Sequence, residues 1–196
     1  KITKKSKFLM PYVKEKTKIS IACKSFPQWG YCSLGSCQLL QRHKESPQEH
    51  DERGTFFCKK HPWMKLLPAR LVMTCKQGHL DEFPWVQWVH GDKNNPKTIC
   101  EDGELQWKGG RNSTSLGDYF VKCSCGARNN MNGATSPKGI MIYYPDGSSD
   151  IVKCGGQKPW LDSEEKCETK NGDTTEIPIG VLARSTSLYY SKLIRG

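Results

Sequence analysis

Cysteine and histidine are the residues of this sequence with the clearest capacity for chemistry. The 196 residues include 10 Cys and 5 His. Thiolate and imidazole groups are the ligands that Zn²⁺ prefers, usually four of them at the corners of a tetrahedron. Four residues separate Cys32 from Cys37, two separate Cys58 from His61, and a polar stretch lies between the pairs. This spacing predicts a zinc-ribbon-like site formed by Cys32, Cys37, Cys58 and His61.

A second group of cysteines lies in the C-terminal half of the chain. Cys123 and Cys125 have one residue between them, and Cys154 is followed by two glycines that let backbone amides approach its thiolate. Together with Cys167 they predict a site of four thiolates. A site with four protein ligands has no open coordination position, so we expect it to support folding rather than catalysis.

Other residues compete for these positions, so the assignment of ligands to individual ions stays open. Cys75 and His79 have three residues between them and could also clamp an ion, and Cys100 and His90 are further candidates. We therefore expect one or two zinc ions per chain.

The chain carries none of the common enzyme motifs. It has no phosphate-binding loop of the ATPase type, no HExxH and no G-x-S-x-G. A non-catalytic role is therefore favoured. The alternative is a metal-dependent nuclease that uses His79, Asp81 and His90 around an ion with open coordination.

A disulfide-linked, secreted scaffold is a further alternative. The even number of cysteines and the glycosylation sequon at Asn112 favour it. Cys123 and Cys125, however, are too close in sequence for an unstrained disulfide, and several cysteines have a histidine nearby. We therefore favour zinc, reduced thiols and a cytoplasmic location.

Charge is the second unusual property. Lys and Arg number 30 against 20 Asp and Glu, for a formal net charge of +10. A basic surface favours nucleic acid as a partner, because binding releases the counterions of the phosphates. Eight of the basic residues lie in the first 24 positions. The candidate DNA contacts in the remainder are Arg70, Arg128, Lys138 and Arg184.

The elements that must position these residues are mostly short strands. Apolar or β-branched runs predict strands over 66–75, 105–107, 118–125, 139–144 and within 177–194. A short helix is expected from Asp81, with Pro84 in its first turn and Trp85, Trp88 and Val89 on one face. The predicted fold class is α+β, a strand-rich zinc-binding domain with zinc-ribbon-like knuckles and few short helices.

The domain organisation follows from the same patterns. Residues 1–20 predict a basic N-terminal arm, 21–65 a small zinc module, and 66–196 a larger zinc-binding domain that is incomplete at its C-terminal end. Apolar residues make up 36% of the chain and mean hydropathy is −0.67, so the core is lean and needs metal or disulfide support. The sequence contains no run of 18 apolar residues, the length that would predict a membrane span, so we expect no membrane partner.

Two blocks resemble a known family. They are FPQWGYC at 26–32 and ARLVMTCKQGHLDEFPWVQWVH at 69–90, and they are similar to the DrmB family of accessory subunits of the DISARM anti-phage defence system. The resemblance continues, in the same order, through three further segments that extend it over most of residues 26–190: VKCSCGARNNMNGA (121–134), CGGQKPWL (154–161) with Cys167, and ARSTSLYY (183–190).

The resemblance implies a bacterial, cytoplasmic protein that partners a separate helicase and helps it to engage phage DNA. It carries over no catalytic residues, and metal ligands only at the Cys and His positions already named. The chain departs from the family at three points. Cys123 and Cys125 are one residue apart instead of two, His61 stands in place of a cysteine, and Arg184 is followed by Ser185 instead of glycine.

Overall fold

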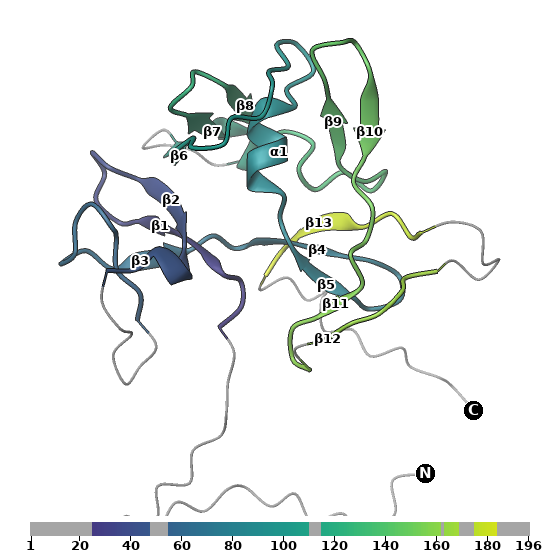
Figure 1. Ribbon diagram of the computed structural model, residues 1–196, viewed down its shortest axis with the longest axis horizontal. Coiled ribbons are helices and arrows are strands. Elements are labelled where there is room, and N and C mark those ends of the chain that lie inside the picture. Colours follow the sequence, from purple (N-terminus) through teal and green to yellow (C-terminus); the bar gives the residue numbers. More distant parts are fainter. Residues whose placement is uncertain (1–24, 48–54, 110–114, 162, 169–174, 184–196) are drawn as a thin grey trace, which may run out of the picture.

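The computed structural model describes residues 25–47, 55–109, 115–161, 163–168 and 175–183, which form a strand-rich fold (Figure 1). One α-helix and two 3-10 helices occur in this part of the chain. The elements in chain order are β1 (Trp29–Cys32), β2 (Leu39–Arg42), η1 (His43–Glu45), β3 (Leu66–Pro68), β4 (Leu71–Thr74), β5 (Leu80–Glu82), α1 (Trp85–His90), β6 (Leu105–Gly109), η2 (Leu116–Asp118), β7 (Tyr119–Cys123), β8 (Arg128–Asn130), β9 (Met141–Tyr143), β10 (Ser149–Ile151), β11 (Gln157–Lys158), β12 (Ser163–Glu164) and β13 (Ile179–Leu182).

The strands form one six-stranded sheet and three smaller ones. The large sheet has the order β3-β1-β2-β6-β7-β8, and a three-stranded sheet has the order β13-β4-β5. The hairpins β9–β10 and β11–β12 complete the set, and all the pairings are antiparallel. Glycines with positive φ serve two of the tight turns, Gly78 between β4 and β5 and Gly147 between β9 and β10.

Helix α1 covers one face of β7 and β8 and also contacts β9 (Figure 1). Two hydrogen bonds attach it to β8. The Asn129 amide donates to the Trp88 carbonyl oxygen at 2.7 Å, and the Trp88 indole N–H donates to the Asn130 carbonyl oxygen at 3.2 Å. Trp85, Trp88 and Val89 are all buried, so they share the core-facing side of the helix as predicted. This packing supplies the main apolar core.

The sequence predicted the strand-rich character correctly, and the few short helices with it. The α+β class overstated the helical share, because the described residues contain a single six-residue α-helix and are mostly β. The predicted strand over 66–75 is interrupted at Ala69 and Arg70, which divide it into β3 and β4 of different sheets.

The helix start was placed too early. Asp81 lies in β5, where it pairs with Met73 across from β4, and α1 begins at Trp85 with Pro84 as its N-cap. The hydrogen-bonding partners offered by β4 hold residues 80–82 extended, and this tertiary pairing overrides the local helix-start pattern.

The division into an arm, a module and a larger domain stays a prediction. The proposed arm lies outside the described residues. Strand β3, from the C-terminal side of the predicted boundary, pairs with β1 in the same sheet as β2 and β6. In the described part of the chain, no helix has the length and apolar character to cross a bilayer.

His43 gives the fold a predicted pH dependence. Burial lowers the pKa of His43 to about 4, and its ring stacks on Phe56 with centroids 4.0 Å apart. In the unfolded chain, His43 has the ordinary histidine pKa of about 6.5. Between about pH 6.5 and pH 4 its imidazole is therefore protonated in the unfolded state but neutral in the native state. The stability that neutral His43 supports is complete above pH 6.5 and is lost as the pH falls toward about 4.

We expect the stability difference between the native sequence and His43→Gln to fall by up to about 3 kcal/mol between about pH 7 and pH 4. Urea unfolding of both proteins across this range measures it. Proton uptake by the other groups is common to both proteins and cancels in the difference. A difference that does not change with pH would contradict this role for His43.

Candidate metal centres

Twelve cysteine and histidine side chains gather into three clusters in the described part of the chain. The first cluster consists of Cys32, Cys37, Cys58 and His61; the second of Cys75, His79, Cys154 and Cys167; the third of His90, Cys100, Cys123 and Cys125. In each cluster the ligand atoms all lie within 4.8 Å of one another. Each offers three sulfurs and one imidazole nitrogen, a donor set that can hold a metal ion.

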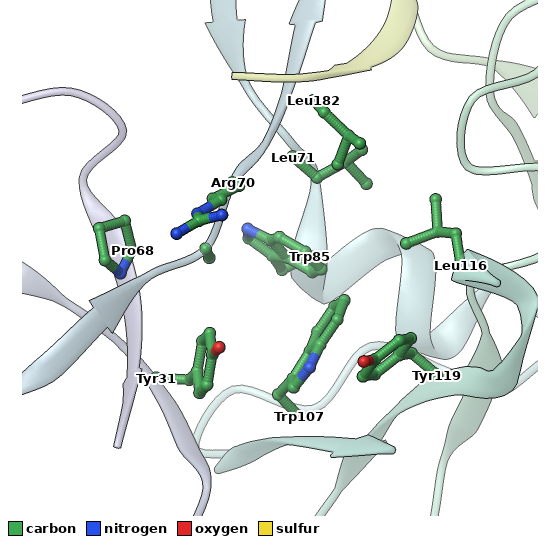
Figure 2. Close-up of a pocket in the computed structure, with 10 residues that line it drawn as sticks. Tyr31, Pro68, Arg70, Leu71, Trp85, Trp107, Leu116, Tyr119 and Leu182 are labelled. Atoms are coloured by element: carbon green, nitrogen blue, oxygen red, sulfur yellow. The ribbon is translucent and has the colours of Figure 1, made fainter. Parts of the chain in front are cut away.

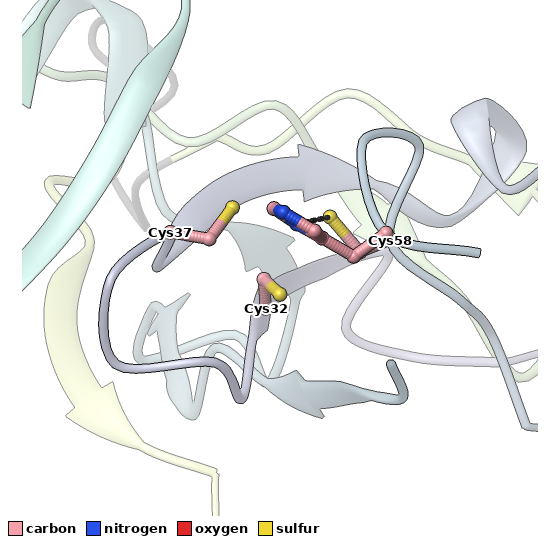
Figure 3. A group of neighbouring side chains, drawn as sticks. Cys32, Cys37 and Cys58 are labelled. Carbon is pink, nitrogen blue, oxygen red and sulfur yellow. Dashed lines mark hydrogen bonds between the residues drawn. The ribbon is translucent and has the colours of Figure 1, made fainter. Parts of the chain in front are cut away.

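Two tight turns build the first cluster. After β1, the Cys37 and Gln38 amides donate to the Leu34 carbonyl oxygen, which returns the chain into β2. The second turn is closed by the His61 amide, which donates to the Cys58 carbonyl oxygen at 3.2 Å. Figure 3 shows the Cys32, Cys37 and Cys58 thiols converging on a common point. The sequence predicted this set of four residues, and the structure brings all four together.

The second cluster joins the β4–β5 turn to the segments on either side of the β11–β12 hairpin. His79 Nδ1 lies 3.3 Å from Cys75 Sγ and 3.6 Å from Cys154 Sγ, and Cys75 Sγ lies 3.9 Å from Cys167 Sγ. The other nitrogen of His79, Nε2, donates to Glu165 Oε1 at 2.8 Å. A carboxylate behind a histidine fixes the tautomer that leaves the opposite nitrogen able to bind a metal.

The third cluster is assembled at the C-terminal end of α1. His90 Nδ1 donates to the Val86 carbonyl oxygen at 2.7 Å, which leaves Nε2 as the basic nitrogen. That atom lies 3.3 Å from the sulfurs of both Cys100 and Cys125. Cys123 Sγ completes the group, 3.4 Å from Cys100 Sγ.

The one-residue spacing of Cys123 and Cys125 still forms a knuckle. The Gly126 amide donates to the Cys123 carbonyl oxygen at 3.0 Å, and Gly126 has a φ of 88°, which glycine adopts without strain. This turn connects β7 to β8 and places both thiols in the third cluster.

The predicted four-thiolate site is corrected by this geometry. Cys123 and Cys125 belong to the third cluster, whereas Cys154 and Cys167 belong to the second. The physical reason is the position of α1, which brings His90 to the β7–β8 turn, while β5 and the β11–β12 hairpin bring Cys154 to His79. The competing candidates Cys75, His79 and Cys100 thus take the remaining positions.

The nuclease arrangement is not brought together either. His79 and His90 lie in different clusters. Asp81 accepts hydrogen bonds from the backbone amides of Gly155 and Glu82, and burial raises its pKa. The helix start expected at Asp81 is replaced by this strand position.

The distances between ligand atoms fit tetrahedral coordination of one ion per cluster. Bonds of about 2.0 Å to nitrogen and 2.3 Å to sulfur place the corners of a tetrahedron roughly 3.5–3.8 Å apart. The closest pairs of ligand atoms span from 3.3 Å between Cys100 and His90 to 3.9 Å between Cys75 and Cys167, and all the pairs in a cluster lie within 4.8 Å. A disulfide has sulfurs about 2.05 Å apart, and the nine described cysteines are all free.

Thiol acidity in the clusters shows the effect of crowding. Burial and the neighbouring thiols raise the pKa of Cys100 to about 12, and burial raises that of Cys32 and Cys154 to about 12. At Cys125, desolvation is outweighed by the Ala127 amide and by the neighbouring Cys123, His90 and Cys100, which lower its pKa to about 6. Several thiolates at such short range repel one another, and a divalent cation is the charge that would offset this.

Sequence reasoning missed two supporting residues. Glu165 orients His79, and its surface position amid charged residues gives no sequence signal. Gly103 lies so close to the third cluster that an added Cβ would overlap the sulfurs of Cys100 and Cys123. The sequence signal that could have identified Gly103 is its position three residues after the ligand Cys100.

Three Cys3His clusters in a mostly β fold define a cysteine-rich protein with three candidate metal centres. The chain belongs to a family described as a domain of unknown function, DUF8724, whose model matches residues 1–190. It is also 31% identical over 132 residues to the DISARM protein DrmB of Bacillus paralicheniformis. That match covers 67% of this chain and 20% of the relative, so the chain spans about a fifth of the length of the curated relative it matches.

Gly103→Ala is expected to disrupt the third cluster alone, because the new methyl group displaces two of its sulfurs. We expect titration with Co²⁺, followed by its thiolate charge-transfer absorption, to lose the share of one cluster in three. The control is Gly35→Ala, where an added Cβ meets nothing within 4 Å. Full Co²⁺ binding by Gly103→Ala would contradict the geometry.

Proposed function

We propose that the chain is a zinc-stabilised, non-catalytic accessory domain of a bacterial anti-phage defence system of the DISARM type, and that it binds DNA and a helicase partner. The observation that carries the zinc assignment is the convergence of three sulfurs and one imidazole nitrogen in each of three clusters. The relation to a DISARM protein supports the role in defence. Reduced thiols and a cytoplasmic location belong to the same proposal.

Zinc is the ion that this donor chemistry favours. Three soft thiolates with one imidazole select zinc over the hard cations Mg²⁺ and Ca²⁺, which prefer oxygen. Four protein ligands close the coordination sphere, so each ion would contribute folding free energy and not a reaction site. The proposed number is three ions, instead of the one or two expected from the sequence, because Cys75, His79, His90 and Cys100 join the eight residues of the two predicted sites.

The outer face of β6, β7 and β8 is the proposed DNA-binding surface. Antiparallel partners project from the same side of a sheet, and the register pairs Lys108 with Phe120 and Lys122 with Arg128. Lys122 and Arg128 are exposed. The opposite face carries Val121 and Cys123, which are fully buried. The charged side chains therefore lie on the face that solvent and a phosphate backbone can reach.

The Arg128 guanidinium is held over the Phe120 ring, 3.9 Å from its centroid. Such a cation–π contact orients the guanidinium without neutralising its charge, so it remains available to phosphates. Arg70 and Lys138, the other candidates in the described residues, are exposed and lie elsewhere, and Arg184 lies outside the described residues. Arg128 is thus the best supported of the four.

A helicase partner is proposed from the family resemblance. Large exposed apolar side chains are available for protein contact, among them Trp63 at 72% exposure and Trp160 at 59%. Trp63 also packs edge-on against His61 of the first cluster, with ring centroids 5.6 Å apart. Metal binding there would hold this exposed ring in place.

Cys154→Ser is expected to reduce bound zinc from three ions to two, because it removes one ligand of the second cluster. We expect the melting temperature to fall by roughly 10 °C, since a structural metal site is lost. Native mass spectrometry counts the ions. The control is Thr135→Ser, a similarly small change at an exposed residue that belongs to none of the three clusters. Three ions in Cys154→Ser would refute the second site.

Replacing both Lys122 and Arg128 by Ala is expected to weaken duplex DNA binding by about tenfold at low salt. It should also reduce the magnitude of the negative slope of log K against log salt by about 2, because two phosphate contacts are lost. Fluorescence anisotropy with a labelled duplex, measured over a salt series, gives both quantities. The charge-matched control is Lys93→Ala with Lys153→Ala, two exposed lysines that are not part of β6, β7 or β8. Equal losses of affinity in both double variants would mean that only the net charge matters. That result would contradict the assignment of DNA binding to this face of the sheet.

A further inference from the structure

Figure 2 shows an aromatic pocket of about 270 Å³. It lies on the face of β6 and β7 opposite Lys122, because Trp107 pairs with Val121 and Tyr119 lies two residues before Val121 on the same strand. Its walls include the rings of Tyr31, Trp85, Trp107 and Tyr119, and Arg70 lies at one side. Ligand pockets for drug-sized molecules begin at roughly 300 Å³, so this space suits a group the size of a single flat ring system. No function described above uses it.

Trp85 supplies the observation that points to a ligand. The side chain is 1% exposed, yet its indole N–H has no hydrogen-bond acceptor among the described residues. Leaving a buried donor without an acceptor costs about 1–3 kcal/mol. In Figure 2 the nitrogen of Trp85 points to the side of the pocket where Arg70 lies. The ligand is therefore expected to bring a hydrogen-bond acceptor to this position.

Arg70 and Tyr31 define the polarity of the ligand further. No carboxylate forms an ion pair with the exposed Arg70 guanidinium within the described ranges. Burial raises the pKa of Tyr31, so its hydroxyl remains a neutral donor at neutral pH. These groups are donors, and the Arg70 charge disfavours the cationic ligands that aromatic pockets otherwise attract.

The rings provide stacking surfaces for a flat ligand. Tyr31 and Trp107 are nearly parallel, with 25° between their planes and centroids 6.1 Å apart. A ring stacked between them needs about 7 Å, two contacts of about 3.5 Å each. The two ring centroids must therefore move apart by roughly 1 Å to admit a base, and Tyr31 is only half-buried. Trp107 is fixed on its other side by stacking on Tyr119, with centroids 5.3 Å apart.

We propose that this pocket binds one unpaired nucleobase of a single-stranded nucleic acid, stacked on Tyr31 and Trp107, with its acceptor edge on the Trp85 N–H and the strand's phosphate near Arg70. A base combines a flat π-face with carbonyl oxygens, and its phosphate matches the guanidinium. The proposal rests on the proposed nucleic-acid-binding function, but it uses a different face of β6 and β7. The two can therefore fail separately.

The test uses the metal-loaded chain and three strands of about 10 nucleotides, within the length that one binding domain covers. The first strand is fully abasic, the second carries a single thymine, and the third carries difluorotoluene, an apolar isostere of thymine. All three have the same charge. We expect the thymine strand to bind about 5- to 100-fold tighter than the abasic strand, and the difluorotoluene strand to bind about 2- to 10-fold more weakly than the thymine strand.

Variants assign the effect to the pocket. Tyr31→Leu and Arg70→Gln should each reduce the thymine preference, and Tyr144→Leu, a tyrosine outside the pocket with 37% exposure, should leave it unchanged. Equal binding of the thymine and abasic strands would overturn the pocket while duplex binding through Lys122 and Arg128 survives. Loss of binding to every strand and duplex would overturn both proposals. Competition by thymidine monophosphate as strong as by the strand would assign the pocket to free nucleotides and overturn the single-strand proposal.

Discussion

The close approach of ionisable thiols is the constraint on which the rest of this structure depends. Three clusters bring together segments far apart in the sequence, such as Cys75 with Cys167 and His90 with Cys125. The apolar core alone is lean, with 36% hydrophobic residues in the chain. Without a cation, the thiols resist joint ionisation, as the raised pKa of Cys100 shows. When a cation is bound, the same thiolates become its ligands and hold the strands together, as in small metal-dependent folds.

Helix α1 and the third cluster together position the two faces of the large sheet. Helix α1 occupies one face of β7 and β8, and its last residue, His90, enters the third cluster. The β7–β8 turn contributes Cys123 and Cys125 to the same cluster, so the strand pairing that presents Lys122 beside Arg128 is held at its end by the proposed ion. The aromatic pocket lies on the face of the sheet that α1 packs against, opposite Lys122 and Arg128, and next to Trp85 at the start of α1. Zinc chemistry and nucleic-acid binding are linked in this account through the position of a single short helix.

The sequence predicted what local spacing determines. Cys32, Cys37, Cys58 and His61 form two pairs on tight turns, and pairs of this kind reveal a shared site. The strands β6, β7 and β9 and the buried face of Trp85 and Trp88 follow from apolar patterns. The other two ligand sets depend on which turns meet in space: Cys154 joins His79, 75 residues away, through the pairing of β5 with its neighbours. Spacing gives no signal for that, and Asp81 was misplaced for the same reason, because β4 pairs with it.

Zinc K-edge X-ray absorption on the purified chain, combined with metal counting on the same sample, tests the central claim most directly. The account predicts three zinc ions per chain, each with an average of three sulfur neighbours at about 2.3 Å and one nitrogen at about 2.0 Å. Fewer ions, shells dominated by oxygen, or oxidised cysteines in place of metal would contradict it.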